Sequence, residues 1–503
     1  MSSTSRVTNL GVSGMDIDQT VKDLMKAKRV PYDKMFQSKT LAEWKKASYN
    51  TMYKTISDFR TTVFNNKLQA TLSPKTASSA NESIATVTAN ADAANVSHEL
   101  EVTQLAEGVK RTSSAAITTG TSKDTLAAQF GISGSFDIKV ANGENIATVT
   151  VNSTESIYDF VQKLNNAGAG VTANYDATLD RFFLSTTNSG ANSGIDFSGS
   201  SAAGLNFLKD NLKVVNSTAA ADISFSGKDA VFKLDGVELK QQSNSFTISG
   251  VNYKLKSTNI GSPISVGVAA DIDKTIENVK AFVESYNTML SKVNTAVKET
   301  RYKDFSPLTT EQRGELTETE AKQWDEKAKS GMLYNDQILR SLVDGIRDDV
   351  SSPVAGISGN YNSASAIGIT TGAYTEGGKL YIDETKLRAA LTADPNAVNK
   401  LFATDGATDS QDGIAVRMYD TLKTAMDSIK SEAGISAGVS DDTTSVLAKQ
   451  INQYTKDMTS LNTRLDDMED RYYKQFSAME TALSKLANQS SWISSMLDTK
   501  SNS

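Results

Sequence analysis

The C-terminal part of the chain carries a regular apolar pattern, and this pattern constrains the fold more than any other feature. Apolar residues there are separated by alternating steps of four and three, with one extra residue beside Tyr472 and Tyr473. A mean period close to 3.5 residues is typical of a coiled-coil helix, and the extra residue indicates one local slip in the seam. The apolar positions are Leu447, Ile451, Tyr454, Met458, Leu461, Leu465, Met468, Tyr472, Phe476, Met479, Leu483 and Leu486.

A helix over residues 446–497 would be about 78 Å long at about 1.5 Å per residue, which exceeds the width of an ordinary domain. Each apolar side chain of its stripe costs about 1.5–3 kcal/mol when it stays in water, so the helix needs a partner. The other long stretch with a similar period lies at residues 15–24 and 41–63. We therefore expect the two chain ends to pair. The residues expected in this terminal interface are Met15, Ile17, Val21, Leu24, Leu461, Leu465, Met468, Phe476, Met479, Leu483, Leu486 and Trp492.

The middle of the chain has a different composition. Residues 77–271 are rich in Ser, Thr, Asn, Ala, Gly and Val, and they show the apolar–polar alternation that predicts strands. Within this block, residues 146–151 read as a strand, 156–166 as a short amphipathic helix, and 171–175 and 181–185 as a strand pair. This order predicts a β-α-β-β module.

Two further signals set the expected boundaries. The helical period returns at Ile276, and the six prolines, including Pro31 and Pro74, fall between patterned segments and serve as provisional boundaries. We therefore predict an α+β multidomain protein in which the terminal helices form a coiled-coil stalk and helical bundle, with an inserted β-rich head of two domains. The expected domains are 1–40 with 465–503 (terminal leg), 41–76 with 272–464 (helical stalk), 77–112 with 230–271 (β-rich head) and 113–229 (second β-rich head).

Composition excludes several classes of function. The chain has no cysteine, which excludes disulfides, thiol catalysis and thiolate metal sites. Its formal charge of −7 comes from interspersed charges without a basic stripe, so we expect no nucleic acid partner. No run of 18 or more apolar residues suggests a membrane span, and residues 1–10 do not resemble a secretory signal peptide.

No motif for catalysis, a cofactor or a metal is present. We find no Walker A, dinucleotide-binding, GxSxG or HExxH pattern, and the loop from Asp409 to Gly413 lacks the final glutamate of an EF-hand. The acidic stretch 315–326 contains interleaved lysines, which favours a solvated helix over a calcium site. His98 is the single histidine, and its setting in a strand segment favours a structural role over catalysis. We therefore expect no catalytic residue, no cofactor and no metal.

Stretches spread over nearly the whole chain resemble the flagellar filament cap family, also called hook-associated protein 2. One departure is Val12, where the family is expected to have a small residue. The stretches that carry the resemblance are Leu10–Asp16 with Val21 and Leu24–Met25, Val102–Ala106, the module 146–185, Asp235–Gly236, Gly250–Val251, Phe305–Thr309, Trp324–Gly331, Gly378–Asp383, and Gln475–Glu480 through Gln489–Trp492.

The resemblance implies a non-enzymatic assembly factor at the distal tip of the bacterial flagellum, secreted through the flagellar type III channel, that promotes flagellin folding and polymerisation. It implies a homo-oligomeric ring, with five copies favoured, whose terminal helices contact flagellin. Other implied partners are the hook–filament junction proteins and an export chaperone at the C-terminal helix. The terminal-interface residues are then also the candidates for flagellin contact.

Two other functions remain open from the sequence. The Ser/Thr/Asn-rich head could make the protein a surface adhesin displayed on a helical stalk, and an enzyme could work through His98. Trp492 also has two interpretations of equal weight, an aromatic anchor at an interface or a side chain buried within the terminal seam.

Overall fold

The computed structural model describes residues 14–435 and 442–501, and these form two compact units. The helical unit comprises Met1–Leu72 and Ile276–Ser503, and the β-rich unit comprises Ser73–Thr275. The β-rich unit is therefore an insertion between two helical segments, as the change in composition predicts. Residues 10–13 of the expected N-terminal turn, including Val12, lie outside the described residues.

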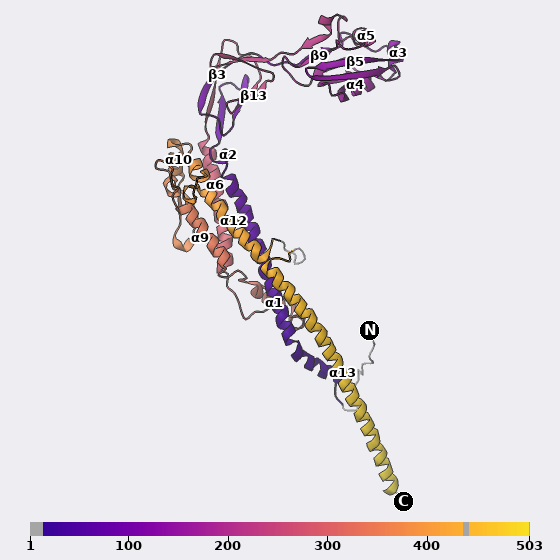
Figure 1. Ribbon diagram of the computed structural model, residues 1–503, viewed down its shortest axis with the longest axis vertical. Helices are drawn as coiled ribbons and strands as arrows, with labels where there is room; N and C mark the ends of the chain where they lie inside the picture. The colour runs from indigo at the N-terminus through magenta and orange to yellow at the C-terminus, as the bar shows by residue number, and fades with distance from the viewer. Residues whose placement is uncertain (1–13, 436–441, 502–503) are drawn as a thin grey trace. The chain divides into compact units, whose positions relative to one another are not determined.

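Two long helices from opposite ends of the sequence run side by side in the helical unit (Figure 1). Helix α1 spans Ile17–Asn65. Its N-cap residue is Asp16, whose side chain accepts a hydrogen bond from the Gln19 N–H. Helix α13 spans Val446–Ser501, which confirms the long helix predicted for residues 446–497. The pairing of the chain ends is therefore confirmed.

The prediction that Pro31 marks a boundary is wrong, because Pro31 lies inside α1. A proline within a helix removes one backbone hydrogen bond and crowds the preceding turn. Tertiary packing supplies most of a helix's stability and can offset that cost. Here Tyr32, directly after the proline, packs against the buried residues that α1 shares with α13.

The rest of the helical unit surrounds the upper part of α1. Helix α6 (Ile272–Lys298) confirms the helical period predicted from Ile276, and its Phe282 packs between Phe59 and Phe402, with ring centroids 6.0 Å and 5.3 Å apart. The remaining elements are α2 (Gln69–Leu72), α7 (Thr310–Gly314), α8 (Glu318–Lys329), α9 (Gln337–Ser351), β16 (Ile369–Thr371), β17 (Leu380–Ile382), α10 (Glu384–Ala393), α11 (Ala397–Ala403) and α12 (Ile414–Ala433).

Two apolar cores are present in the β-rich unit. One is formed by a five-stranded sheet of order β1-β15-β3-β11-β12 and a three-stranded sheet of order β13-β14-β2. Its strands are β1 (Lys75–Ser79), β2 (Ala85–Ala89), β3 (Val96–Gln104), β11 (Ala230–Leu234), β12 (Val237–Gln241), β13 (Ser245–Ile248), β14 (Val251–Leu255) and β15 (Ile264–Ala270).

The other core of this unit contains the predicted β-α-β-β module. The module is confirmed as β6 (Asn145–Asn152), α4 (Ile157–Asn166), β7 (Val171–Asp176) and β8 (Arg181–Thr186). Its strands belong to two sheets, because β6 pairs with β5 while β7 pairs with β8. The other elements are β4 (Lys110–Thr112), α3 (Leu126–Phe130), β5 (Ser135–Asn142), β9 (Gly194–Asp196), α5 (Ala202–Asn206) and β10 (Ser224–Ser226).

The chain enters and leaves the β-rich unit on neighbouring strands. Strand β1 pairs antiparallel with β15, so that Lys75 lies opposite Ala270. The Asp271 N–H also donates to the Pro74 carbonyl at 2.9 Å. Such adjacent ends allow a whole unit to be inserted into another with little distortion of either.

Candidate assembly interface

The first and last helices share a small apolar core, here called the terminal seam. Its fully buried members are Ile17, Val21 and Met25 of α1 and Leu465 of α13. The partly buried side chains packed against them are Tyr32, Leu461, Met468, Tyr472, Tyr473 and Phe476.

Residue spacing explains why these side chains meet. In α1 the buried residues recur every four positions, which places them on one face of the helix. In α13 the steps of four and three keep Leu461, Leu465 and Met468 on the side that faces α1. The slip predicted beside Tyr472 coincides with two adjacent tyrosines that both pack against the seam.

The structure places the predicted interface residues in three environments. Ile17, Val21 and Leu465 are buried in the seam, while Leu461, Met468, Phe476 and Leu483 are partly buried. Five others are exposed, and they are Met15, Leu24, Met479, Leu486 and Trp492.

Leu24 was predicted in the seam from the sequence. In the structure Met25 is buried instead, and Leu24 is 39% exposed. The uniform four-residue step from Ile17 through Val21 leads to Met25, and this step was the signal that could have identified it. Because Trp492 is 61% exposed, the interpretation that it is buried within the seam is wrong.

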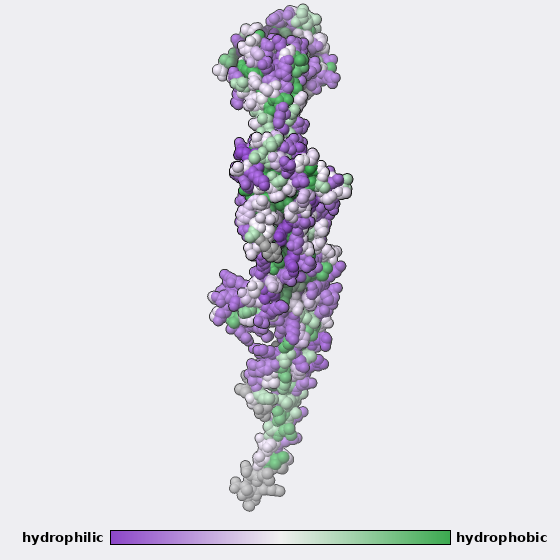
Figure 2. Space-filling view, turned by 90° about the vertical axis from the view of Figure 1, so that its left-hand side faces the viewer, coloured by the Kyte–Doolittle hydropathy of each residue, from purple (hydrophilic) through white to green (hydrophobic). Residues whose placement is uncertain are grey.

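The C-terminal part of α13 therefore presents an apolar surface. Leu486 is 59% exposed, and Met479, Trp492 and Ile493 are also exposed on this helix. Figure 2 shows hydrophobic side chains along the lower part of this helix. Exposed apolar side chains that gather on one element are typical of a surface that binds another protein.

A buried ion pair also holds the two ends together. Lys46 of α1 is 2% exposed, and its Nζ lies 3.0 Å from Asp442 Oδ2. The same carboxylate accepts hydrogen bonds from the Ser445 hydroxyl and backbone, and these bonds hold the pKa of Asp442 well below its usual value. Apolar periodicity carries no signal for a buried lysine, so the sequence did not reveal this pair.

The residues considered for chemistry take structural positions. His98 Nδ1 lies 2.5 Å from Asp235 Oδ2, and Asp235 Oδ1 accepts the Glu99 N–H, so this group closes a turn between strands. Among the described residues, no group of three or more histidines or acidic residues is arranged to hold a metal ion. None of the helices in the described part of the chain has the length and apolar character needed to cross a lipid bilayer.

Family models match most of the chain. The model of the flagellar hook-associated protein 2 C-terminus matches residues 227–488, and that of its N-terminus matches residues 13–108. The flagellin hook IN motif matches residues 135–188, which include the β-α-β-β module.

Curated relatives and a solved structure agree with these matches. The chain is 31% identical to flagellar hook-associated protein 2 of Halalkalibacterium halodurans, over 94% of this chain and 96% of the relative. It is 25% identical to that of Escherichia coli K12 over 99% of both chains. The crystal structure of the D1-D2-D3 domains of the E. coli flagellar cap protein FliD has a similar fold, with a TM-score of 0.59 at 18% identity, and covers 81% of this chain and 99% of that one.

Proposed function

Because the chain belongs to the flagellar hook-associated protein 2 family, we propose that it caps the bacterial flagellar filament and promotes the folding and polymerisation of flagellin at its distal tip. The observation that carries this proposal is the family match over residues 227–488, together with the relative that is similar over nearly the whole chain. The family is structural, which supports a protein that acts by binding and positioning other chains.

The terminal seam gives a physical basis for this activity. Ile17, Val21, Met25 and Leu465 hold the ends together, while Leu486 and neighbouring apolar residues of α13 stay exposed. An exposed apolar helix face can bind another helix weakly and release it again. When several copies each contribute one such contact, the assembly stays attached while single contacts break.

The assembly that we propose is a homo-oligomeric ring in contact with flagellin, with five copies favoured. Its further partners would be the hook–filament junction proteins and an export chaperone that covers the C-terminal helix before assembly. The exposed apolar residues of α13 support the proposal of a chaperone, because such side chains favour binding to another protein over exposure to water.

We also propose four functional parts for the chain. The terminal leg would be 1–40 with 465–503, and the helical stalk 41–76 with 272–464. The two head domains would be 77–112 with 230–271, and 113–229. The separate apolar cores of the β-rich unit, at residues 85–268 and 109–223, support two head domains.

An adhesin remains the alternative from the sequence, but the relatives do not support it. The relatives reported above are described as flagellar hook-associated or flagellar cap proteins. If the β-rich unit binds sugars or surfaces, this would be a second function beside filament capping.

Deletion of residues 475–503 tests the proposal. A strain with this deletion should secrete flagellin monomers into the medium and form short filaments or none, because the exposed face of α13 is removed. A finer variant replaces Leu486 and Trp492 with serine, and its matched control replaces the exposed polar residues Asn488 and Gln489 with serine. Normal filament growth in the deletion strain would contradict the proposal.

A further inference from the structure

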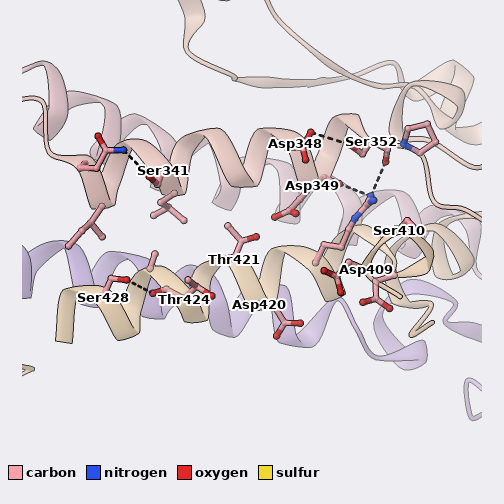
Figure 3. Close-up of a pocket in the computed structure, with 17 residues that line it drawn as sticks. Ser341, Asp348, Asp349, Ser352, Asp409, Ser410, Asp420, Thr421, Thr424 and Ser428 are labelled. Atoms are coloured by element: carbon pink, nitrogen blue, oxygen red, sulfur yellow. Dashed lines mark hydrogen bonds between the residues drawn. The ribbon is translucent and has the colours of Figure 1, made fainter. Parts of the chain in front are cut away.

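A cavity of about 780 Å³ lies between α9 and α12, outside the terminal seam. Figure 3 shows its lining residues on these two facing helices and on the short turn that contains Asp409 and Ser410. The lining includes five aspartates, and Arg417 is its one basic residue among the described residues. The cavity is therefore negatively charged.

Asp349 provides the buried carboxylate of this cavity. The residue is 9% exposed and lines the cavity, and its side chain is directed into the space between the two helices (Figure 3). The Thr421 side chain from α12 lies near this carboxylate (Figure 3). The Oδ2 atom of this carboxylate has no hydrogen-bond partner among the described residues. A buried carboxylate oxygen without a hydrogen-bond donor destabilises the folded state, because it loses its hydrogen bonds to water and forms none within the protein.

Arg417 does not supply the missing donor. Its Nη2 donates to the backbone carbonyls of Asp349 and Ser352, both at 2.8 Å. Its Nε has no partner among the described residues. The arginine therefore binds the backbone at the C-terminal end of α9 rather than the Asp349 carboxylate. Asp349 Oδ2, which can only accept a hydrogen bond, is left facing the cavity.

The aspartates around this oxygen extend the negative surface. Asp348 directly precedes Asp349 in α9, Asp420 lies on α12, and Asp409 lies on the adjoining turn. These residues do not form a compact ligand set for a metal ion, since no group of three such side chains in the described part of the chain is close enough. A larger cation with several donors fits a cavity of this size and charge better than a single ion.

We propose that this cavity binds an organic cation through a guanidinium or primary ammonium group that donates to Asp349 Oδ2. A guanidinium has five N–H donors in a planar fork, so one group can satisfy Asp349 while it also reaches a second carboxylate. Hydrogen bonds between such a group and a carboxylate are among the stronger ones in proteins. The cation can come from an arginine or lysine side chain of a second copy of this chain or from a free small molecule.

The test uses the full chain and two probes of equal shape. Calorimetric titration with N-acetyl-arginine amide should show saturable binding, whereas N-acetyl-citrulline amide, which has a neutral urea in place of the guanidinium, should bind at least about ten-fold more weakly. The Asp349→Asn variant should lose binding of the arginine probe by a similar factor. Equal binding of both probes, or no binding of either, would overturn the proposal.

Matched variants separate the cavity from its surroundings. Asp427→Asn, on the same helix α12, removes an exposed carboxylate that pairs with Lys423 at 2.8 Å and should leave probe binding unchanged. If Asp349→Asn does not fold, as judged by circular dichroism, Asp420→Asn takes its place and should weaken binding. Binding that survives both cavity variants would contradict the proposed site.

A second measurement identifies the source of the cation. Sedimentation of the wild type and of Asp349→Asn should show weaker self-association of the variant if the cation is a side chain of a second copy. Unchanged self-association, with probe binding lost, would support a free small cation. The terminal seam is untouched in these variants, so a failure here leaves the proposed cap function standing.

Discussion

At the residue scale, two buried carboxyl groups of the helical unit have opposite electrostatic environments. Asp442 is paired with Lys46 and hydrogen-bonded by Ser445, which lowers its pKa. Asp349 is buried without a direct ion pair, and desolvation raises its pKa to about 6. Proximity of Asp348 and Asp420 adds to this rise, while Thr421 and Arg417 oppose it. The two groups should therefore respond to pH in opposite directions.

The Asp349 carboxyl predicts higher stability at mildly acid pH. Its pKa is raised above the ordinary value of 3.8, so the folded state binds the proton more tightly than the unfolded state does. By linkage, the free energy of unfolding should rise as pH falls from above 6 towards 4, by roughly 1–3 kcal/mol. Urea unfolding of wild type and Asp349→Asn at pH 7.5 and 5 measures this, and the variant should lack the added rise. An equal pH response in both proteins would exclude Asp349 as its source.

We expect a large loss of stability when one partner of the Lys46–Asp442 pair is removed. Lys46→Met should lower the free energy of unfolding by about 3–5 kcal/mol, because Asp442 stays buried with its charge unpaired. The double variant Lys46→Met with Asp442→Asn should recover part of the loss. Lys54→Met, at an exposed position of the same helix, is the control and should change stability by less than about 0.5 kcal/mol. A loss in the control as large as in Lys46→Met would indicate a general effect of charge on α1.

At the element scale, α13 combines a buried stretch and an exposed stretch within one continuous pattern. The buried stretch ends near Phe476, and the apolar steps continue to Leu486, where the side chain is exposed. The same periodicity therefore stabilises the protein in one half of the helix and provides a binding surface in the other.

Two matched substitutions in α13 separate these roles. Leu465→Ala should destabilise the pairing of α1 with α13 by about 2–5 kcal/mol, because it leaves a cavity in the terminal seam. Leu486→Ala removes an exposed side chain and should leave stability within about 0.5 kcal/mol while it weakens filament assembly. Hydrogen exchange of α1 amides measures the first effect, and secreted flagellin measures the second. Equal exchange rates in the two variants would contradict this division.

Much of the fold could be predicted at this scale because helices and strands have characteristic periods. The long helix at 446–497, the helical period from Ile276 and the β-α-β-β module were all visible as repeats of 3.5, 3.6 or 2 residues. The continuation of α1 through Pro31 was not, because packing overrides the local preference of proline. Periodicity also cannot reveal the Lys46–Asp442 pair or the orphan oxygen of Asp349, which depend on residues far apart in sequence.

At the scale of the whole molecule, the β-rich unit is self-contained. The buried residues of its two apolar cores all lie between Ala85 and Val268. Its ends lie opposite each other as Lys75 and Ala270, so their Cα atoms are about 4.5–5.5 Å apart, as antiparallel partners are.

This architecture predicts that residues 73–275 fold without the helices. The isolated segment should give a β-type circular dichroism spectrum and a cooperative thermal transition. Leu100→Asp, which places a charge at a fully buried position of β3, should abolish the transition. A segment that unfolds gradually, without a transition, would show that the helical unit is needed to stabilise it.

The distance in sequence between Lys46 and Asp442 also sets the order of events as the chain is made. The two residues are 396 positions apart, and synthesis proceeds from the N-terminus at about 5–20 residues per second, so α1 waits roughly 20–80 s for its companion. During that interval the β-rich insert and α6 can already be complete, while the part of α1 that pairs with α13 still lacks this partner. The pairing of α1 with α13 is then the last step of folding. Slower translation lengthens the period in which the apolar side chains of α1 are exposed to aggregation.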